Sequence, residues 1–123
     1  MEIALRQAEK ARGLTATNPA VGCVIVKDNK IIALSHTGYN GVPHAEPLAL
    51  EFAGQQAQGA DMYVTLEPCA HYGKTPPCTK AIIAAGVRKV FIGLTDPDQR
   101  VSGRGVRELK EANIMVEQSI LAK

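Results

Sequence analysis

The sequence predicts an α/β domain with one mixed five-stranded sheet and helices on both of its faces. Three observations support this class. A length of 123 residues suits a single domain, which we expect to span residues 1–123. A β-hairpin pattern occupies residues 21–34, and strand and helix patterns then alternate to residue 116. A hairpin makes neighbouring strands antiparallel, whereas each strand–helix–strand unit makes its strands parallel, so the sheet should be mixed.

The first predicted elements are a helix and the hairpin. Apolar side chains recur at loose helical spacing over residues 2–12, and Gly13 ends the pattern. The almost wholly apolar run at 21–26 is typical of a strand covered on both faces. A turn-forming pair at 28–29 then leads into a second strand at 30–34.

The rest of the chain alternates between helices and strands. A helix is predicted from residue 44 to about residue 58, and Pro47 is tolerated in its first turn. The remaining predicted elements are a strand at 61–66, a helix at 78–85, a strand at 88–94, a helix at 105–113 and a short strand at 114–116. Helices that follow strands begin at the carboxyl edge of the sheet, which is where open α/β folds bind ligands.

The composition indicates an ordinary globular protein and excludes several classes. The net charge is +2, the basic residues are mostly scattered, and there are two Phe, three Tyr and no Trp. The sequence therefore predicts no nucleic-acid partner. No apolar run approaches the roughly 20 residues needed to span a bilayer, and the charged start of the chain does not resemble a signal peptide. We therefore expect no membrane partner. Because three cysteines are an odd number, we also expect reduced thiols and a cytoplasmic protein.

Three candidate metal ligands and one carboxylate carry the functional signal. His44, Cys69 and Cys78 offer donors that Zn²⁺ prefers, and three protein ligands leave a fourth position for water, as in catalytic zinc sites. Glu46, two residues after the histidine, is then available as a proton carrier. A His-x-Glu motif followed by Pro-Cys and a second Cys is the signature of zinc nucleobase deaminases. The signature has two residues between its cysteines, whereas this chain has the eight residues 70–77.

These residues support hydrolytic removal of an amino group. Zinc lowers the pKa of a bound water from 15.7 to about 7, so that hydroxide becomes available to attack a ring carbon that bears an amino group. One carboxylate beside the metal can then supply protons to the ring nitrogen and to the departing amine, a role worth about 10²–10⁴ in rate. The positive end of a helix dipole should favour an ionised Glu46 and a neutral His44 imidazole.

Each candidate also has an ordinary structural interpretation. Taken singly, His44 would more often be a helix cap or a core histidine, and a lone Glu at a helix start is a common surface charge. The two cysteines of the motif could be buried thiols or ligands of a structural zinc, which would need a fourth ligand from His36 or His71. The joint occurrence of the motifs favours a catalytic metal. We interpret Cys23, inside a predicted strand, as a buried apolar side chain.

Five segments of the sequence identify a family when they are taken together. They are Asn18-Pro-Ala-Val-Gly22, Pro43-His-Ala-Glu46, Val64-Thr-Leu-Glu-Pro-Cys69, His71-Tyr-Gly-Lys-Thr-Pro-Pro-Cys78, and Asp96-Pro with Gly103-Arg-Gly105. In this order they resemble the deaminase domain of the bifunctional deaminase/reductase of riboflavin biosynthesis. The similarity covers nearly the whole chain. Its most specific part is the long interval between the cysteines, because cytidine and tRNA adenosine deaminases carry the two cysteines close together.

The resemblance implies a fold, a reaction and a set of site residues. The fold would be a cytidine deaminase-like three-layer α/β/α sandwich. The reaction would remove the 2-amino group of 2,5-diamino-6-ribosylamino-4(3H)-pyrimidinone 5′-phosphate and release ammonia. By position, zinc would be held by His44, Cys69 and Cys78, with Glu46 as proton shuttle. The substrate pocket would be lined by Asn18, His71, Lys74 and Asp96, with Lys74 suited to an anionic phosphate.

The same resemblance has implications for partners and leaves alternatives open. The family's NADPH-dependent reductase domain has no counterpart in these residues, so we expect it on another chain or on a longer form of this one, and we expect a homo-oligomer. A deaminase of guanine, cytidine or a tRNA adenosine is the alternative enzyme, and a zinc-stabilised binding module is the non-enzymatic alternative. Asp98 and Thr37 stand where many family members have Asn and His, so we assign neither of them, nor His36, to the site.

Overall fold

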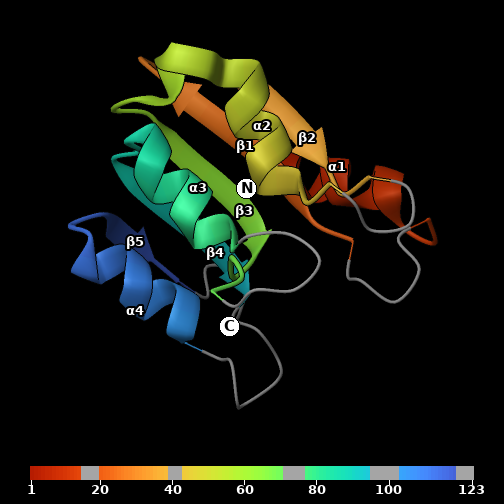
Figure 1. Cartoon of the computed structure of the whole chain (residues 1–123). Helices are drawn as coiled ribbons and strands as arrows, with labels where there is room; N and C mark the ends of the chain where they lie inside the picture. The colour runs from red at the N-terminus through yellow and green to blue at the C-terminus, as the bar shows by residue number, and fades with distance from the viewer. Residues whose placement is uncertain (15–19, 39–42, 71–76, 95–102, 119–123) are drawn as a thin grey trace.

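The computed structural model describes residues 1–14, 20–38, 43–70, 77–94 and 103–118. Its elements are α1 (Glu2–Ala11), β1 (Gly22–Lys27), β2 (Lys30–His36), α2 (Ala45–Ala53), the 3₁₀ helix η2 (Gly54–Ala57), β3 (Asp61–Leu66), α3 (Cys78–Ala85), β4 (Lys89–Leu94), α4 (Arg104–Glu111) and β5 (Met115–Glu117). Their order is the predicted one (Figure 1). In the described parts of the chain, no helix combines the length and the apolar character needed to cross a membrane.

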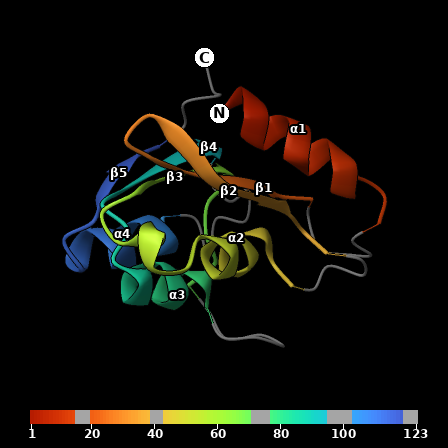
Figure 2. The same ribbon diagram turned by 90° about the horizontal axis from the view of Figure 1, so that it is seen from above.

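The five strands form one mixed sheet in the order β2-β1-β3-β4-β5. β1 is antiparallel to both of its neighbours, while β3, β4 and β5 are parallel to one another. Figure 2 shows α1 on one face of the sheet and α2, α3 and α4 on the other. The predicted mixed sheet between two helical layers is therefore confirmed.

The hairpin between β1 and β2 has the turn that its sequence predicts. Asp28 and Asn29 both have positive φ, 52° and 64°, as a two-residue type I′ turn requires. β2 continues two residues beyond the predicted end, because Ser35 and His36 pair with the first residues of β1. This extension brings the end of β2 to the edge of the sheet at which α2 begins.

The predicted helix from residue 44 to residue 58 is too long. The α-helix α2 ends at Ala53, and Gly54 adopts φ 58° and ψ −135°, a backbone conformation that favours glycine and ends the helix. A separate 3₁₀ turn, η2, then leads towards β3. The other predicted helices and strands of the second half agree with the structure to within about two residues.

The core lies between the sheet and the helices on the side of α2 and α3. Alternate residues of the two central parallel strands point into it, and all four are completely buried: Met62, Val64, Val90 and Ile92. Cys23 of β1 is also completely buried in this cluster, as predicted. The core therefore gives the helix starts that carry the candidate ligands a rigid base.

On the opposite face, α1 packs against the backbone of β1. A Cβ atom at Gly22 would collide with the carbonyl oxygen of Ala4 and would lie 2.6 Å from the amide nitrogen of Ala8. Glycine at this position therefore allows the helix and the strand to approach closely.

Candidate metal centre

The candidate ligands gather at one edge of the sheet. Because β1 is antiparallel to its neighbours, its first residue lies at the same edge as the last residues of β2, β3 and β4. His44 is the N-cap residue of α2, and Cys78 is the first residue of α3. Cys69 follows the end of β3 by three residues. The three candidate ligands therefore lie at the carboxyl edge of the parallel strands, where open α/β folds bind ligands.

The three predicted ligand side chains lie together. The ligand atoms of His44, Cys69 and Cys78 are all within 4.8 Å of one another. Nδ1 of His44 is 3.2 Å from Sγ of Cys78 and 3.9 Å from Sγ of Cys69. In a tetrahedral zinc site with the usual bond lengths, a nitrogen and a sulfur ligand are about 3.6 Å apart. The donor set and its spacing therefore fit a zinc ion with only small adjustments.

The beginning of α3 holds Cys69 in place. The backbone N–H of Cys78 donates a hydrogen bond to Sγ of Cys69 over 3.2 Å, and the N–H of Thr79 donates to the carbonyl oxygen of Cys69, also over 3.2 Å. Cys78 therefore lies next to Cys69, although eight residues separate the two cysteines in the sequence. These N–H groups have no partner within the helix, which leaves them free to orient the ligand.

The structure also bears on the fourth ligand that a structural zinc would require. His36, one of the two candidates, is not part of the ligand group, and its Nδ1 lies 3.0 Å from the carbonyl oxygen of Thr37. His71, the other candidate, lies outside the described residues. Among the described residues, the ligand group thus has three members, which is the number expected for a catalytic zinc.

The ligand group is accessible from one side. A cavity of about 460 Å³ lies between the beginnings of α2 and α3. Its lining residues are Pro43, His44, Pro47, Pro77, Cys78, Lys80 and Ala81. Because two of the three candidate ligands line this cavity, the metal position is open rather than sealed in the core, as a site that exchanges water must be.

Glu46 is buried in the first turn of α2, with 4% of its surface exposed. Burial raises the pKa of its carboxyl to about 7, and a backbone hydrogen bond only partly opposes this shift. Charges on Cys69 and His44 also act on this pKa, so the carboxyl lies close to the ligand group. The backbone hydrogen bond at the helix start favours the ionised form, as expected, but the loss of solvation at Glu46 is the larger effect.

The ligand side chains shift one another's pKa values through hydrogen bonds. A hydrogen bond from the Cys78 thiol, together with one from His44, lowers the pKa of Cys69, while donating that bond and being buried raise the pKa of Cys78. The bond to Cys69 also raises the pKa of His44, and burial partly opposes this shift. The arrangement concentrates negative charge on one sulfur, and a bound metal ion would deprotonate both thiols.

Thr37 has a structural role. Its N–H donates to the carbonyl oxygen of Val21, and its Oγ1 accepts a hydrogen bond from the N–H of Val21, each over 2.9 Å. The side chain is buried and ties the end of β2 to the residue before β1. These contacts account for Thr37 as a residue that supports the sheet edge.

The predicted substrate residues cannot be placed in the same way. Asn18, His71, Lys74 and Asp96 all lie outside the described residues, as does Asp98. Their assignment stays a prediction. The described residues that flank them do, however, lie at the sheet edge that carries the ligands, since β1 begins there and β3 and β4 end there.

The sequence analysis did not single out Glu67, the residue after β3. Its side chain is buried, and its two carboxylate oxygens accept hydrogen bonds from backbone N–H groups of Gly103, Gly105 and Val106 at the start of α4. A local signal was available, because an acidic residue directly before the Pro-Cys pair is unusual for the end of a buried strand. Its partners, 36 to 39 residues further along, could not be inferred from that signal.

Comparison with known proteins identifies the family. The family described as the cytidine and deoxycytidylate deaminase zinc-binding region matches residues 1–94. The chain belongs to this deaminase family. The matched region contains all three members of the ligand group and Glu46. Zinc is therefore the cofactor of this deaminase-family chain, in agreement with its His, Cys, Cys donor set.

Individual relatives agree with the family assignment. The chain is 50% identical over 117 residues to the riboflavin biosynthesis protein RibD of Aquifex aeolicus. This match covers 95% of this chain and 33% of the relative. Its structure matches that of a diaminohydroxyphosphoribosylaminopyrimidine deaminase/5-amino-6-(5-phosphoribosylamino)uracil reductase from Thermotoga maritima, with a TM-score of 0.90, 46% identity, and coverage of 98% of this chain and 35% of the other. The chain thus spans about one third of the length of these relatives.

A shorter relative matches along most of its own length. It is a structure from a study of A-to-I editing by tRNA:A34 deaminases, with a TM-score of 0.73 and 32% identity. The match covers 98% of this chain and 91% of that one. The predicted cytidine deaminase-like fold is therefore confirmed, both in its topology and by relatives that share it.

Proposed function

We propose that this chain is the deaminase domain of riboflavin biosynthesis and hydrolyses 2,5-diamino-6-ribosylamino-4(3H)-pyrimidinone 5′-phosphate. The observation that carries this proposal is the similarity to proteins named RibD. The chain is 49–50% identical to two of them over nearly its whole length, and it covers about one third of the length of each. A similar solved structure is named for both a deaminase and a reductase activity. Since the matched third is the zinc-binding deaminase region, the reductase activity belongs to the part of those proteins that this chain does not cover.

In this proposal, zinc is bound by Nδ1 of His44 and Sγ of Cys69 and Cys78. The spacing of these three atoms supports the assignment, as does the cavity that reaches two of them. When bound, the ion supplies a water acidified to a pKa of about 7 and a positive charge next to the reacting ring carbon. Cys23 takes no part, because its side chain is packed in the core.

Glu46 would move the protons. Its carboxylate accepts a proton as the water oxygen bonds to the ring carbon, and passes it to the ring nitrogen next to that carbon. It then takes the remaining proton from the hydroxyl group now on the ring carbon and transfers it to the amino group as the carbon–nitrogen bond breaks. The overall reaction consumes one water, converts the C–NH₂ group to a carbonyl and releases one ammonia. Burial of Glu46 supports this role, because it raises the carboxyl pKa to about 7, close to the pH at which a group that both accepts and donates protons works best.

Substrate contacts in this proposal come from Asn18, His71, Lys74 and Asp96. Asn and Asp side chains can pair with the N–H and C=O groups of the pyrimidine ring, and the Lys74 ammonium can bind the phosphate. The proposed partners are the phosphorylated pyrimidine and a reductase that acts on the product. We further propose a homo-oligomer located in the cytoplasm.

The test is an ammonia-release assay with the purified zinc-loaded chain. The substrates are the diaminopyrimidine ribotide, its unphosphorylated nucleoside, guanine, cytidine and a tRNA with adenosine at position 34. We expect release from the ribotide to exceed release from every other substrate by at least about 100-fold in kcat/KM, since loss of a phosphate contact removes charge-assisted hydrogen bonds. Preferential turnover of the tRNA would instead favour the editing activity studied in the shorter relative.

A further inference from the structure

We propose that Thr79 is a positioning residue of the metal centre, whose hydroxyl group donates a hydrogen bond to the sulfur of Cys69 when the metal ion is bound. Thr79 is the second residue of α3 and directly follows the candidate ligand Cys78. Its side chain is completely buried, with 0% of its surface exposed. Its Oγ1 is the one buried side-chain polar atom of the described residues that has no hydrogen-bond partner.

A buried hydroxyl without a partner is unusual. Burying such a group destabilises a fold unless it is hydrogen-bonded, so nearly all buried polar side chains of native proteins have a partner. The other two buried threonines of the described chain follow this rule. Oγ1 of Thr65 accepts a 3.1 Å hydrogen bond from the N–H of Gly22, and Oγ1 of Thr37 accepts one of 2.9 Å from the N–H of Val21. The exception at Thr79 therefore calls for an explanation in the function of the site.

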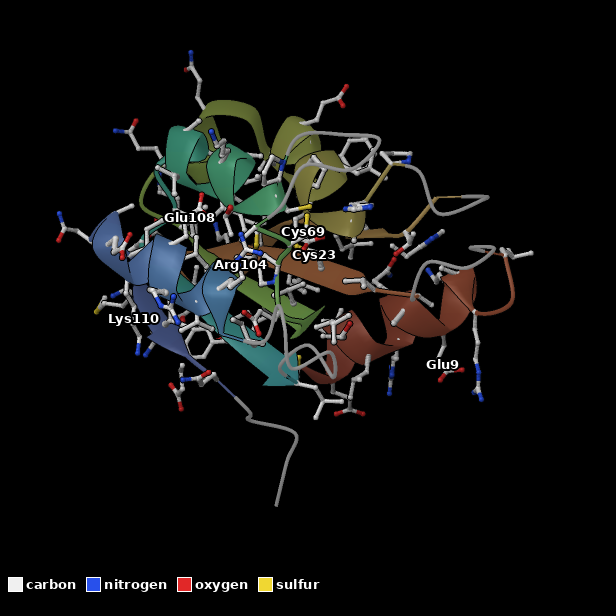
Figure 3. All side chains as sticks on the ribbon, turned by 60° about the horizontal axis from the view of Figure 1, so that its bottom comes forward. Glu9, Cys23, Cys69, Arg104, Glu108 and Lys110 are labelled. Atoms are coloured by element: carbon white, nitrogen blue, oxygen red, sulfur yellow. The ribbon has the colours of Figure 1, made fainter. Side chains whose placement is uncertain are left out.

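The backbone places Thr79 against Cys69. The N–H of Thr79 donates a 3.2 Å hydrogen bond to the carbonyl oxygen of Cys69, and the N–H of Cys78 donates to Sγ of Cys69 over the same distance. Cys69 thus lies against the first turn of α3, on the side of the sheet that carries this helix (Figure 3). Because Cα–Cβ bonds tilt towards the N-terminus of a helix, the Thr79 side chain leans towards the end of α3 that Cys69 contacts.

A metal-bound sulfur is a suitable acceptor for this hydroxyl. Hydrogen bonds to ligating groups orient these groups and tune the metal, and thiolate sulfurs accept such bonds. A hydroxyl hydrogen rotates about the C–O bond, so it can be directed at an acceptor that comes within reach. The ligand atoms need only small adjustments to fit a zinc ion, and in this proposal that movement completes the bond from Thr79. The inference rests on the ligand set of the proposed function, but not on the identity of the substrate.

The principal test compares Thr79→Val with Thr65→Val, which both remove a buried hydroxyl and keep the shape of the side chain. Each purified protein is titrated with Co²⁺, because zinc has a full d shell and gives no thiolate charge-transfer absorption of this kind. We expect Thr79→Val to bind Co²⁺ about tenfold or more weakly than wild type, the factor that is typical for loss of a hydrogen bond to a metal ligand. Its charge-transfer band should move to longer wavelength, because the bond stabilises the sulfur lone pairs. Thr65→Val should bind Co²⁺ as wild type does.

In the metal-free proteins the two variants should differ in the opposite sense. Removing an unpaired hydroxyl at Thr79 should leave the midpoint of urea unfolding at or above the wild-type value. Thr65→Val leaves the N–H of Gly22 without a partner, so its midpoint should fall. Thr79→Ser keeps the hydroxyl and removes a buried methyl group, so it should lower the midpoint while retaining the wild-type affinity for Co²⁺.

Three results would overturn the proposal. Unchanged Co²⁺ affinity and spectrum in Thr79→Val would show that the hydroxyl does not reach the sulfur. A urea midpoint that falls as far as in Thr65→Val would show that the hydroxyl has a structural partner, such as a buried water. Equal losses of affinity in Thr79→Val and Thr79→Ser would assign the effect to side-chain shape. None of these measurements involves turnover, so a wild-type chain that fails to deaminate the ribotide would refute the proposed substrate and not this inference.

Discussion

The hydroxyl of Ser35 donates a 2.6 Å hydrogen bond to the carbonyl oxygen of Ala45, which joins β2 to the first turn of α2. Ala45 lies between the candidate zinc ligand His44 and the proposed proton carrier Glu46. Both residues of this bond are buried. The hydrogen bond therefore holds the middle residue of the His-x-Glu motif at a fixed distance from β2.

Ser35→Ala should lower the free energy of unfolding by about 1–3 kcal/mol, because it leaves a buried carbonyl without this partner. The measurement is urea unfolding of the metal-free protein, so that zinc binding does not mask the loss. Asp61→Asn is a useful comparison. It weakens a partly exposed pair with Arg88 at 2.8 and 3.0 Å and should cost less than about 1 kcal/mol. Equal losses in the two variants would contradict the importance of the buried bond.

Glu46→Gln should abolish ammonia release while the fold and the zinc are retained. The amide has nearly the same shape as the carboxylate but cannot take up and return a proton, so we expect kcat to fall by about 10²–10⁴ or more. Turnover and metal content are measured on the same preparation. Glu51→Gln, an exposed change on the same helix, should behave as wild type. A Glu46→Gln variant with normal turnover would exclude the proton-transfer role.

The three cysteines should respond differently to removal. Cys69→Ala and Cys78→Ala each delete one donor of the ligand group and should lose most of the bound zinc at micromolar concentrations. Cys23→Ala leaves the donors intact and should retain one zinc per chain, although a small core cavity should lower stability by about 1 kcal/mol. Metal analysis after dialysis decides the matter. Zinc retained by both ligand variants would show that the ion binds elsewhere.

Gly22→Ala should destabilise the packing of α1 on the sheet. The added methyl group would meet the backbone of Ala4 and Ala8, so the helix would have to move, at a cost of about 3 kcal/mol. Gly13→Ala serves as the control, because the space around Gly13 is open and only its positive φ of 81° opposes a side chain, at about 1 kcal/mol. Chemical denaturation compares the two. If Gly22→Ala costs no more than the control, the contact between α1 and β1 is looser than the structure shows.

Local signals in the sequence were sufficient for much of the fold. α3 was predicted with its observed bounds, because the double proline before Cys78 and the glycine at 86 limit it on both sides. The Asp28-Asn29 pair predicted the hairpin turn. α2 was predicted too long, because the residues after Gly54 are compatible with a helix and only the observed backbone conformation shows that the glycine ends it.

The candidate metal centre was predicted less completely than the fold. His44, Cys69 and Cys78 could be found because the type and order of metal-binding residues are visible in the sequence. The raised pKa of Glu46 could not, since it depends on how deeply the folded chain buries the carboxyl. Ser35 and Glu67 were missed for a related reason: their hydrogen-bond partners lie 10 and at least 36 residues away, and no local pattern records such pairings.

The direction of β1 has a consequence for how substrate choice can change. Because this strand runs against its neighbours, the connection from α1 into β1 reaches the same rim of the sheet as the connections leaving β2, β3 and β4. The ligand side chains lie at the first turns of two helices and just after β3, whereas the four connections each begin or end at this rim. Evolution can lengthen or rewrite any of these connections without rebuilding the reactive centre. A chain of this fold can thereby change the molecules that it prefers while its ligand group stays the same.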